Sequence, residues 1–474
     1  MTQYQEYLSL FGVTPQDLQK LLSIALSRGG DYADLYFEDS ISDNITLLDA
    51  KVSSAGHHID YGVGIRVLSG ERTGYAYSET TELSAMERAA RTAAMIASDN
   101  ETIKSPEGSV GILDTKRHYS ISTKEAENSI EKKIALLYEL DEITKQADKR
   151  VNKVIALIAN SVSRILFINS LGESYVDERP MTTLSANCVM EEKGVSESGG
   201  CSRSFRKGVE MLNSTLVAEV SSEMISRTSF LFKARQPKGG VMPVIMGAGA
   251  SGILLHEAMG HAFEADFNRK GISIFSDRMG KQICNKEINI IDDGTVDFNR
   301  GAVNFDDEGI PGQKTYMVRE GRLNSYLHDR ISARFYGVAP TGNGRRESFR
   351  YIPIPRMRLT YMEKGNNNEE ALIKSVNKGI YCDNFTNGQV NIGAGDFTFY
   401  VKSGYLIENG KLTLPIKDTN IIGNGPQTLA DITAVANNLK IDNSKWVCGK
   451  EQYCPVSCGM PTVLVKSLTV GGNI

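Results

Sequence analysis

Residues Ser251–His261 read Ser-Gly-Ile-Leu-Leu-His-Glu-Ala-Met-Gly-His and contain two of the six histidines of the chain. Glu257 directly follows the first of them, His256, and the second is His261. Two neutral imidazoles beside a carboxylate are typical of a metal centre with its own general base. The apolar, glycine-rich residues 247–255 ahead of the pair predict a buried helix, and a dry cavity makes a metal-activated water an effective nucleophile. This stretch therefore predicts a metallopeptidase.

The two histidines are five positions apart, whereas the His-Glu-x-x-His pattern of zinc peptidases separates them by four. On an ideal α-helix five positions correspond to about 500° of rotation, so the two rings would diverge by about 140°. Both rings reach one metal if His261 lies at a distorted or ending turn, a conformation that Gly260 tolerates. The alternative is a buried helix with two hydrogen-bonded histidines and a glutamate in its first turn.

A zinc peptidase site needs a third protein ligand and leaves one position for water. Glu264 lies three residues after His261 and could lie on the same side of a helix. The other source is the segment Cys448–Gly459, whose three cysteines are potential thiolate ligands in a turn-rich loop. The spacing of these cysteines does not match a paired Cys-x-x-Cys framework, which disfavours a separate structural zinc site. The remaining alternative is that some of them are small apolar residues of a core.

Ser251–His261, continued by Glu264–Lys270, resembles the signature of the TldD/PmbA family, on its TldD side. The resemblance covers most of the chain and is strongest in its second half. Further matching segments are Ala33–Glu38, Asp306–Gly309, Gly337–Ser348, Pro355–Met357, Ile407–Gly410, Cys448–Lys450 and Leu468–Gly472. Together these segments are far more specific than the short histidine motif.

The resemblance implies a zinc-dependent peptidase that cuts unfolded peptides in the cytoplasm, with one Zn2+ in each chain. It implies that His256, His261 and Cys448 hold the metal and that Glu257 is the general base. It also implies a closed, tunnel-like interior and a dimer, formed either with a second copy or with a PmbA/TldE-like subunit that lacks the metal motif. The older family label, modulator of DNA gyrase, refers to indirect effects, and no direct binding of nucleic acid is implied.

The chain departs from the family pattern after Cys448–Lys450. Family members usually continue with a Gly-Gln pair and a Val-Pro-Val-Gly run, whereas this segment is one residue shorter and contains Cys454 and Cys458. Either of these could replace Cys448 as a ligand, although the Cys-Gly-Lys match favours Cys448. The group that would stabilise a tetrahedral oxyanion is also open. Residue type alone nominates three candidates for it, namely His328, Tyr381 and Arg345.

The composition is that of a globular protein with several domains. At 474 residues the chain is too long for one ordinary core, and a formal charge of −4 gives no sign of nucleic-acid binding. Seven cysteines at irregular spacing do not suggest a disulfide framework. The N-terminus lacks the pattern of a secretory signal, and no apolar run approaches the roughly 20 residues that span a bilayer. These features predict a cytoplasmic protein without a membrane segment.

The predicted fold class is α+β, with a helix-flanked N-terminal sheet followed by a mostly β catalytic domain that carries the motif helix. Helices are expected from Thr14-Pro15 onward, and over about 82–98, 123–148 and 212–229. Strands are expected over about 151–205, and a linker at Gln236–Gly240. The predicted units are an N-terminal α/β module over 1–110, a central α+β module over 111–236 and a C-terminal metallopeptidase domain over 237–474.

Two other classes of function are open from the sequence. A non-catalytic regulatory or partner subunit would keep the fold, but it has no physical need for His256, Glu257 and His261. A cysteine hydrolase would pair one of the C-terminal thiols with a histidine. Such an enzyme would survive chelation and be inactivated by a thiol-alkylating reagent, whereas a zinc site would lose activity to a chelator and regain it with zinc.

Overall fold

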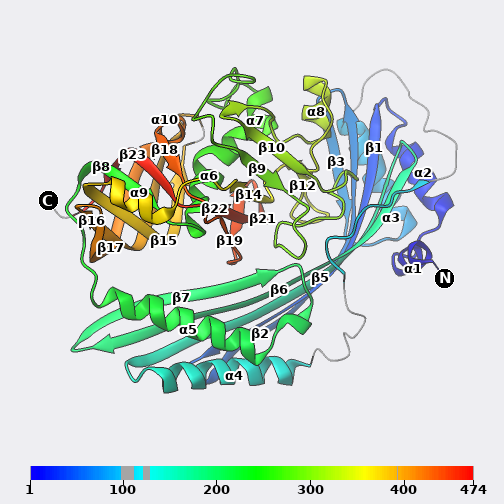
Figure 1. Cartoon of the computed structure of the whole chain (residues 1–474). Helices are drawn as coiled ribbons and strands as arrows, with labels where there is room; N and C mark the ends of the chain where they lie inside the picture. Colours follow the sequence, from blue (N-terminus) through cyan, green and yellow to red (C-terminus); the bar gives the residue numbers. More distant parts are fainter. Residues whose placement is uncertain (1, 98–110, 121–128, 392, 473–474) are drawn as a thin grey trace.

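The computed structural model describes residues 2–97, 111–120, 129–391 and 393–472. The N-terminal half is built on one long, twisted sheet with helices against it, and the C-terminal half contains shorter sheets around the histidine motif (Figure 1). Helices and strands are largely segregated, which confirms the predicted α+β class. Within the described ranges, no helix is both long and apolar enough to cross a membrane.

Seven strands form the long sheet, in the order β3-β2-β1-β5-β6-β4, with β7 paired to β6. Their bounds are β1 Tyr32–Leu48, β2 Lys51–Ser69, β3 Arg72–Ser78, β4 Gly111–Ile112, β5 Val151–Asn169, β6 Glu173–Glu192 and β7 Val195–Phe205. All pairs are antiparallel except the short pair of β4 with β6. Because β1 pairs with β5, the predicted modules 1–110 and 111–236 share one sheet. The module boundaries themselves stay a prediction.

The sequence of β1 explains why the long sheet is buried on both faces at this point. Successive side chains of a strand point to opposite faces, and every side chain of Ala33–Glu38 is buried. The odd-numbered residues of this segment are apolar and pack against the N-terminal helices. The even-numbered ones are Asp34, Tyr36 and Glu38, and they face the C-terminal half.

Five helices of the described N-terminal half cover one face of the long sheet, three at one end and two at the other (Figure 1). They are α1 Gln3–Leu10, α2 Pro15–Ala25, α3 Leu83–Ile96, α4 Ile130–Ala147 and α5 Ser214–Leu231. The predicted helix start is confirmed, because Thr14 caps α2 by accepting the Asp17 N–H at 3.2 Å. Helix α1 was not predicted, although Tyr4, Tyr7 and Leu8 follow a helical spacing and pack in the same core. Part of the helix expected over 123–148 falls at 123–128, outside the described residues.

The C-terminal half contains two six-stranded sheets, in the orders β17-β16-β15-β8-β23-β18 and β11-β10-β9-β14-β22-β19. The strands of the first are β8 Gly240–Met246, β15 Lys378–Val390, β16 Asp396–Glu408, β17 Lys411–Asn424, β18 Ile432–Val435 and β23 Val463–Val470. Those of the second are β9 Ile290–Asp293, β10 Lys314–Arg319, β11 Arg322–Leu323, β14 Leu359–Met362, β19 Lys440–Asp442 and β22 Ser457–Met460. Two hairpins pair β12 Gly344–Arg345 with β13 Ile354–Pro355, and β20 Val447–Lys450 with β21 Gln452–Pro455. The short helices here are α7 Ala265–Arg269, α8 Arg330–Tyr336, α9 Glu369–Ser375 and α10 Gly425–Ala430.

The histidine motif lies in the core that these two sheets share. Apolar side chains of residues 253–263, such as Leu255, Met259 and Phe263, pack with side chains from strands of both sheets. The motif segment is therefore buried, as its apolar sequence predicts. Burial on this scale excludes bulk water from the surroundings of the two histidines.

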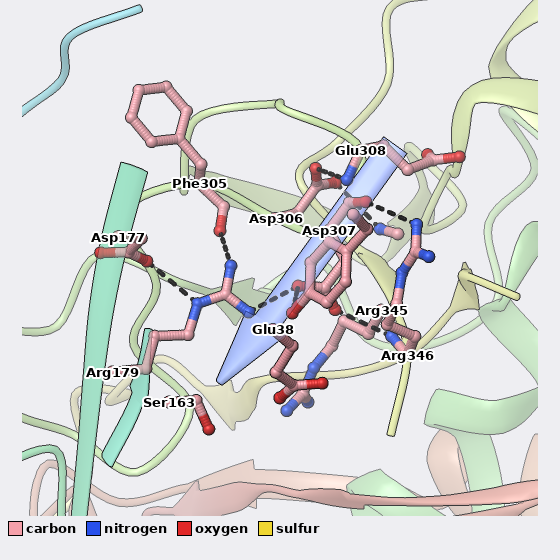
Figure 2. Close-up of polar contacts among 12 residues, drawn as sticks. Glu38, Ser163, Asp177, Arg179, Phe305, Asp306, Asp307, Glu308, Arg345 and Arg346 are labelled. Atoms are coloured by element: carbon pink, nitrogen blue, oxygen red, sulfur yellow. Dashed lines mark hydrogen bonds and ion pairs between the residues drawn. The ribbon is translucent and has the colours of Figure 1, made fainter. Parts of the chain in front are cut away.

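The second face of the long sheet joins the C-terminal half through stacked aromatic rings and buried ion pairs. Tyr175 stacks between Phe167 and Phe305, with ring centroids 5.1 and 4.8 Å apart. Figure 2 shows Arg179 of β6 donating both to Asp177 of its own strand and to Asp307 of the C-terminal half. The two halves are thus joined by specific polar contacts as well as by apolar packing.

A second buried arginine, Arg66 of β2, crosses the same junction. Its Nε lies 2.9 Å from Asp34 Oδ2 of β1, and its Nη1 lies 2.6 Å from Glu308 Oε1 of the C-terminal half. Removing one partner of a buried ion pair leaves an uncompensated charge, at a cost of about 3–5 kcal/mol. The network therefore strongly disfavours any other alignment of the two halves.

Glu38 gives this junction a pH-dependent stability. Burial raises the pKa of its carboxyl to about 7, although the Phe349 N–H that it accepts at 2.9 Å lowers the pKa. The folded chain therefore holds this proton more tightly than the unfolded chain, whose glutamates keep their ordinary pKa near 4.5. The stabilising contribution is complete below that pKa and is lost as the pH rises through about 7.

We expect the Glu38→Gln variant to be more stable than the wild type at pH 8, by on the order of 3 kcal/mol, and nearly equal to it at pH 5. The amide keeps an oxygen acceptor for the Phe349 N–H but never ionises. Urea unfolding of both proteins at the two pH values measures the difference. The same difference at pH 5 and at pH 8 would contradict this account of Glu38.

Candidate metal centre

The helix that carries the two histidines changes its winding between them. It is α-helical over α6 (Ile253–Leu255), forms a π-turn over His256–Gly260 and ends in a 3₁₀ turn over His261–Phe263. In the π-turn the His261 N–H donates to the His256 carbonyl, five residues back. This wider turn brings residues five apart to the same side of the helix. The divergence of an ideal α-helix is thereby removed, and the two ring centroids lie 5.1 Å apart.

Gly260 permits this arrangement for a different reason from the one that the sequence predicts. Its φ is −59°, an ordinary helical value, so the conformational freedom of glycine is not used. A Cβ atom at this position would instead lie 2.0 Å from Met357 Sδ. The predicted distorted turn is present as the π-turn, and the close approach of Met357 favours a small residue at this position.

The hairpin of β20 and β21 brings a thiol to the histidines. Cys448 Sγ lies 3.2 Å from His261 Nε2. The metal-binding atoms of His256, His261 and Cys448 all lie within 4.8 Å of one another, and all three side chains are buried. Three residues that the sequence proposes as metal ligands are therefore brought together from two distant segments.

The other two C-terminal cysteines have different neighbours from Cys448. Cys454 pairs with Cys448 across the hairpin, and its Sγ lies 3.6 Å from Nη1 of Arg356. Cys458 lies on β22, and burial raises the pKa of its thiol well above the usual range. Within the described part of the chain, the cluster that could hold a metal includes neither of them.

The electrostatics of the cluster suit a cation. Burial alone would raise the pKa of the Cys448 thiol, but the neighbouring imidazoles of His256 and His261 lower it to about 4. Both ring nitrogens of His256 are buried, and neither has a hydrogen-bond partner in the described part of the chain. A buried polar atom without a partner costs about 1–3 kcal/mol, and a bound metal ion would remove that cost. Two imidazole nitrogens and a thiolate are ligands of a kind that zinc prefers.

Glu264, the alternative third ligand, lies behind His261 rather than beside Cys448. Its Oε2 is 3.0 Å from His261 Nδ1, on the other side of the ring from the thiol. The same oxygen is 3.0 Å from Lys450 Nζ. Burial would raise the pKa of this carboxyl, but Lys450 and His261 lower it to about 2. Glu264 is therefore an ionised acceptor for the imidazole N–H.

Two buried arginines hold the hairpin in place. Arg356 donates to the carbonyls of Cys448 at 2.7 Å and Gln452 at 2.9 Å. Arg345, a sequence candidate for oxyanion stabilisation, donates to the carbonyls of Met357 and Pro455. No role for Arg356 was predicted, although its segment Pro355–Met357 belongs to the family resemblance and could have drawn attention to it.

The other two candidates for oxyanion stabilisation, Tyr381 and His328, and the proposed base Glu257 each have different surroundings. The Tyr381 hydroxyl donates to Glu369 at 2.9 Å. The His328 ring packs between Tyr326 and Tyr336, and burial lowers its pKa to about 4, so the imidazole is uncharged at neutral pH. The proposed base Glu257 is half-buried in the π-turn, next to His256. The oxyanion-stabilising group stays a prediction.

Known proteins match this chain over nearly its whole length. The three domains of the PmbA/TldA metallopeptidases match residues 33–97 (domain 1), 124–228 (central domain) and 239–472 (C-terminal domain). The metalloprotease TldD homolog of Haemophilus influenzae is 37% identical over 468 residues, which cover 97% of either chain.

Two solved structures share the fold. A protein of Thermotoga maritima described as a modulator of a DNA gyrase aligns with a TM-score of 0.78 at 22% identity, covering 96% of this chain and 99% of that one. TldE from Thermococcus kodakarensis aligns with a TM-score of 0.74 at 18% identity, covering 96% and 100%. The domain matches and the full-length relative lead to one conclusion: the chain belongs to the PmbA/TldD family and is a metallopeptidase.

Proposed function

We propose that this metallopeptidase is zinc-dependent and hydrolyses unfolded or extended peptides. The observation that carries the proposal is the buried cluster of His256, His261 and Cys448. Two nitrogen donors and one thiolate match the ligand set of catalytic zinc sites, which leave a fourth position for water. When bound, zinc lowers the pKa of a coordinated water to roughly neutral and polarises the substrate carbonyl.

Glu257 is the proposed general base. Its carboxylate is next to His256 in sequence and is half-buried in the same π-turn. It accepts the proton of the attacking water and passes that proton to the amine that leaves when the peptide bond breaks. One carboxylate thus performs both proton transfers of the reaction.

Burial of the cluster supports an extended substrate. Each of the three proposed ligands is at most 5% exposed, so a folded protein cannot bring a peptide bond to them. We also propose a dimer, either with a second copy or with a PmbA/TldE-like subunit, whose fold this chain shares. All seven cysteines are free thiols, which fits a reducing compartment such as the cytoplasm.

The same geometry has a feature of a cysteine hydrolase. Cys448, His261 and Glu264 are connected in the order of a nucleophile, a base and an orienting acid. A cysteine nucleophile, however, leaves His256 unexplained, because both of its ring nitrogens are buried without a partner. A bound metal gives a role to all three side chains of the cluster. Membership of a metallopeptidase family supports a metal site.

We expect Glu257→Gln to lower kcat on an unfolded fluorogenic peptide by about 10²- to 10⁴-fold, because general acid–base catalysis contributes on that scale. Zinc content, measured by elemental analysis, should stay at the wild-type level. Glu287→Gln, the same change at an exposed glutamate, is the control and should keep full activity. Wild-type turnover by Glu257→Gln would remove the base assignment.

The ligand assignment is tested by comparing Cys448→Ser with Cys458→Ser. We expect Cys448→Ser to lose zinc and peptidase activity together, because serine does not supply a thiolate. Cys458→Ser should keep one zinc per chain, since that thiol lies outside the cluster. Chelation should inactivate the wild type, and added zinc should restore it. Activity that persists without metal and is lost on alkylation would favour the cysteine mechanism.

A further inference from the structure

We infer that Glu264, held by Lys450, is a positioning residue that fixes the ring tautomer of His261 so that Nε2 faces the metal position. The inference rests on the proposed zinc site and concerns how the chain prepares one ligand for it. The two ring nitrogens of His261 have different neighbours.

The contacts of His261 specify which ring nitrogen carries the proton. The Glu264 carboxylate, which pairs with Lys450, accepts hydrogen bonds and cannot donate one, so Nδ1 of His261, 3.0 Å from Glu264 Oε2, carries a proton. Nε2 is the nitrogen left for a metal, and it lies 3.2 Å from Cys448 Sγ. A carboxylate behind a metal-binding histidine orients the ring and makes it a better ligand.

Lys450 stabilises the ionised carboxylate of Glu264 in its buried position. Glu264 is fully buried, and a buried carboxylate is costly unless a cation lies beside it. Lys450 Nζ lies 3.0 Å from Glu264 Oε2 and 2.8 Å from Asp266 Oδ1, and its side chain is only 5% exposed. The ammonium group therefore neutralises the acceptor without competing for the Nδ1 proton, because it has no acceptor of its own.

The lysine and the thiol belong to the same strand. Cys448 and Lys450 alternate with exposed Val447 and Gly449 in β20, so both point to the buried face of the hairpin. The hairpin thus contacts the motif segment twice, through Cys448 with His261 and through Lys450 with Glu264. The strand that supplies one ligand also secures the residue that orients another.

His256 provides an internal contrast. Neither of its ring nitrogens has a hydrogen-bond partner among the described residues, so no carboxylate orients it. The orienting contact is specific to His261, the ligand that lies after the π-turn, where the helix is about to end. Loss of Glu264 should therefore disturb one ligand of the set and weaken the site without abolishing it.

The test compares Glu264→Met and Glu264→Gln with Glu38→Gln, a matched change at a buried carboxylate in the junction between the two halves. Two-bond ¹H–¹⁵N correlation spectra of the zinc-free, ¹⁵N-histidine-labelled chain identify the tautomer of each of the six histidines. Competition with a chromogenic chelator measures zinc affinity. Thermal unfolding confirms that each variant is folded.

The spectra are followed to a pH at which the His261 ring is neutral; there we expect the Nδ1–H form in the wild type and in Glu38→Gln, and a mixture in Glu264→Met. Zinc affinity should fall about 10- to 100-fold in Glu264→Met, and less in Glu264→Gln, which keeps an acceptor oxygen. Glu38→Gln should bind zinc as the wild type does. If Glu264→Met does not fold, a loss of affinity in Glu264→Gln relative to Glu38→Gln decides the question.

An unchanged tautomer and unchanged zinc affinity in folded Glu264 variants would overturn the positioning role. Failure of the wild type to bind zinc would instead overturn the proposed function. The tautomer spectra would still decide whether Glu264 orients His261, since they are recorded without metal. The two failures are therefore distinguishable.

Discussion

The contact between the Cys448 thiol and the His261 imidazole is the interaction on which the candidate metal centre depends. It joins two side chains that are 187 residues apart in the sequence, at a distance of 3.2 Å. Neither segment can hold this geometry alone, because one is a short helix and the other a short hairpin. Arg356, which donates to the carbonyl of Cys448, and Lys450, which pairs with Glu264, hold the hairpin against the helix.

This arrangement is connected to the junction between the two halves of the molecule. Asp307, which accepts from Arg179 of the long sheet, also accepts the Arg346 N–H at 2.8 Å. The neighbouring Arg345 donates to the carbonyl of Pro455, at the end of the cysteine hairpin. A continuous set of buried contacts thus runs from the N-terminal sheet to the thiol. Buried charges of this kind favour one alignment of the parts over others, which a site with ligands from distant segments requires.

Burial affects the site in two opposite ways. It leaves the two nitrogens of His256 without a hydrogen-bond partner among the described residues, a cost that a cation bound at one of them would reduce. It also strengthens the electrostatic effect of the imidazoles on Cys448, which lowers the pKa of the thiol to about 4 against the effect of desolvation. The consequence is a buried thiolate that faces the two imidazoles, and a deprotonated thiol is the form of this ligand that a divalent metal needs.

The sequence by itself determined what depends on neighbouring residues: the cap at Thr14, the two-sided alternation of Ala33–Glu38, the buried motif helix and the identity of the candidate ligands. The tertiary structure alone decided that the helix widens into a π-turn, that Cys448 rather than Cys454 or Cys458 meets the histidines, and that Glu264 lies behind the ring. The physical reason is whether the interaction joins neighbouring residues or residues that are far apart in the sequence. Caps and periodicity follow from local geometry, whereas the meeting of Cys448 with His261 and the contact of Glu264 with Lys450 join segments that are far apart in the sequence.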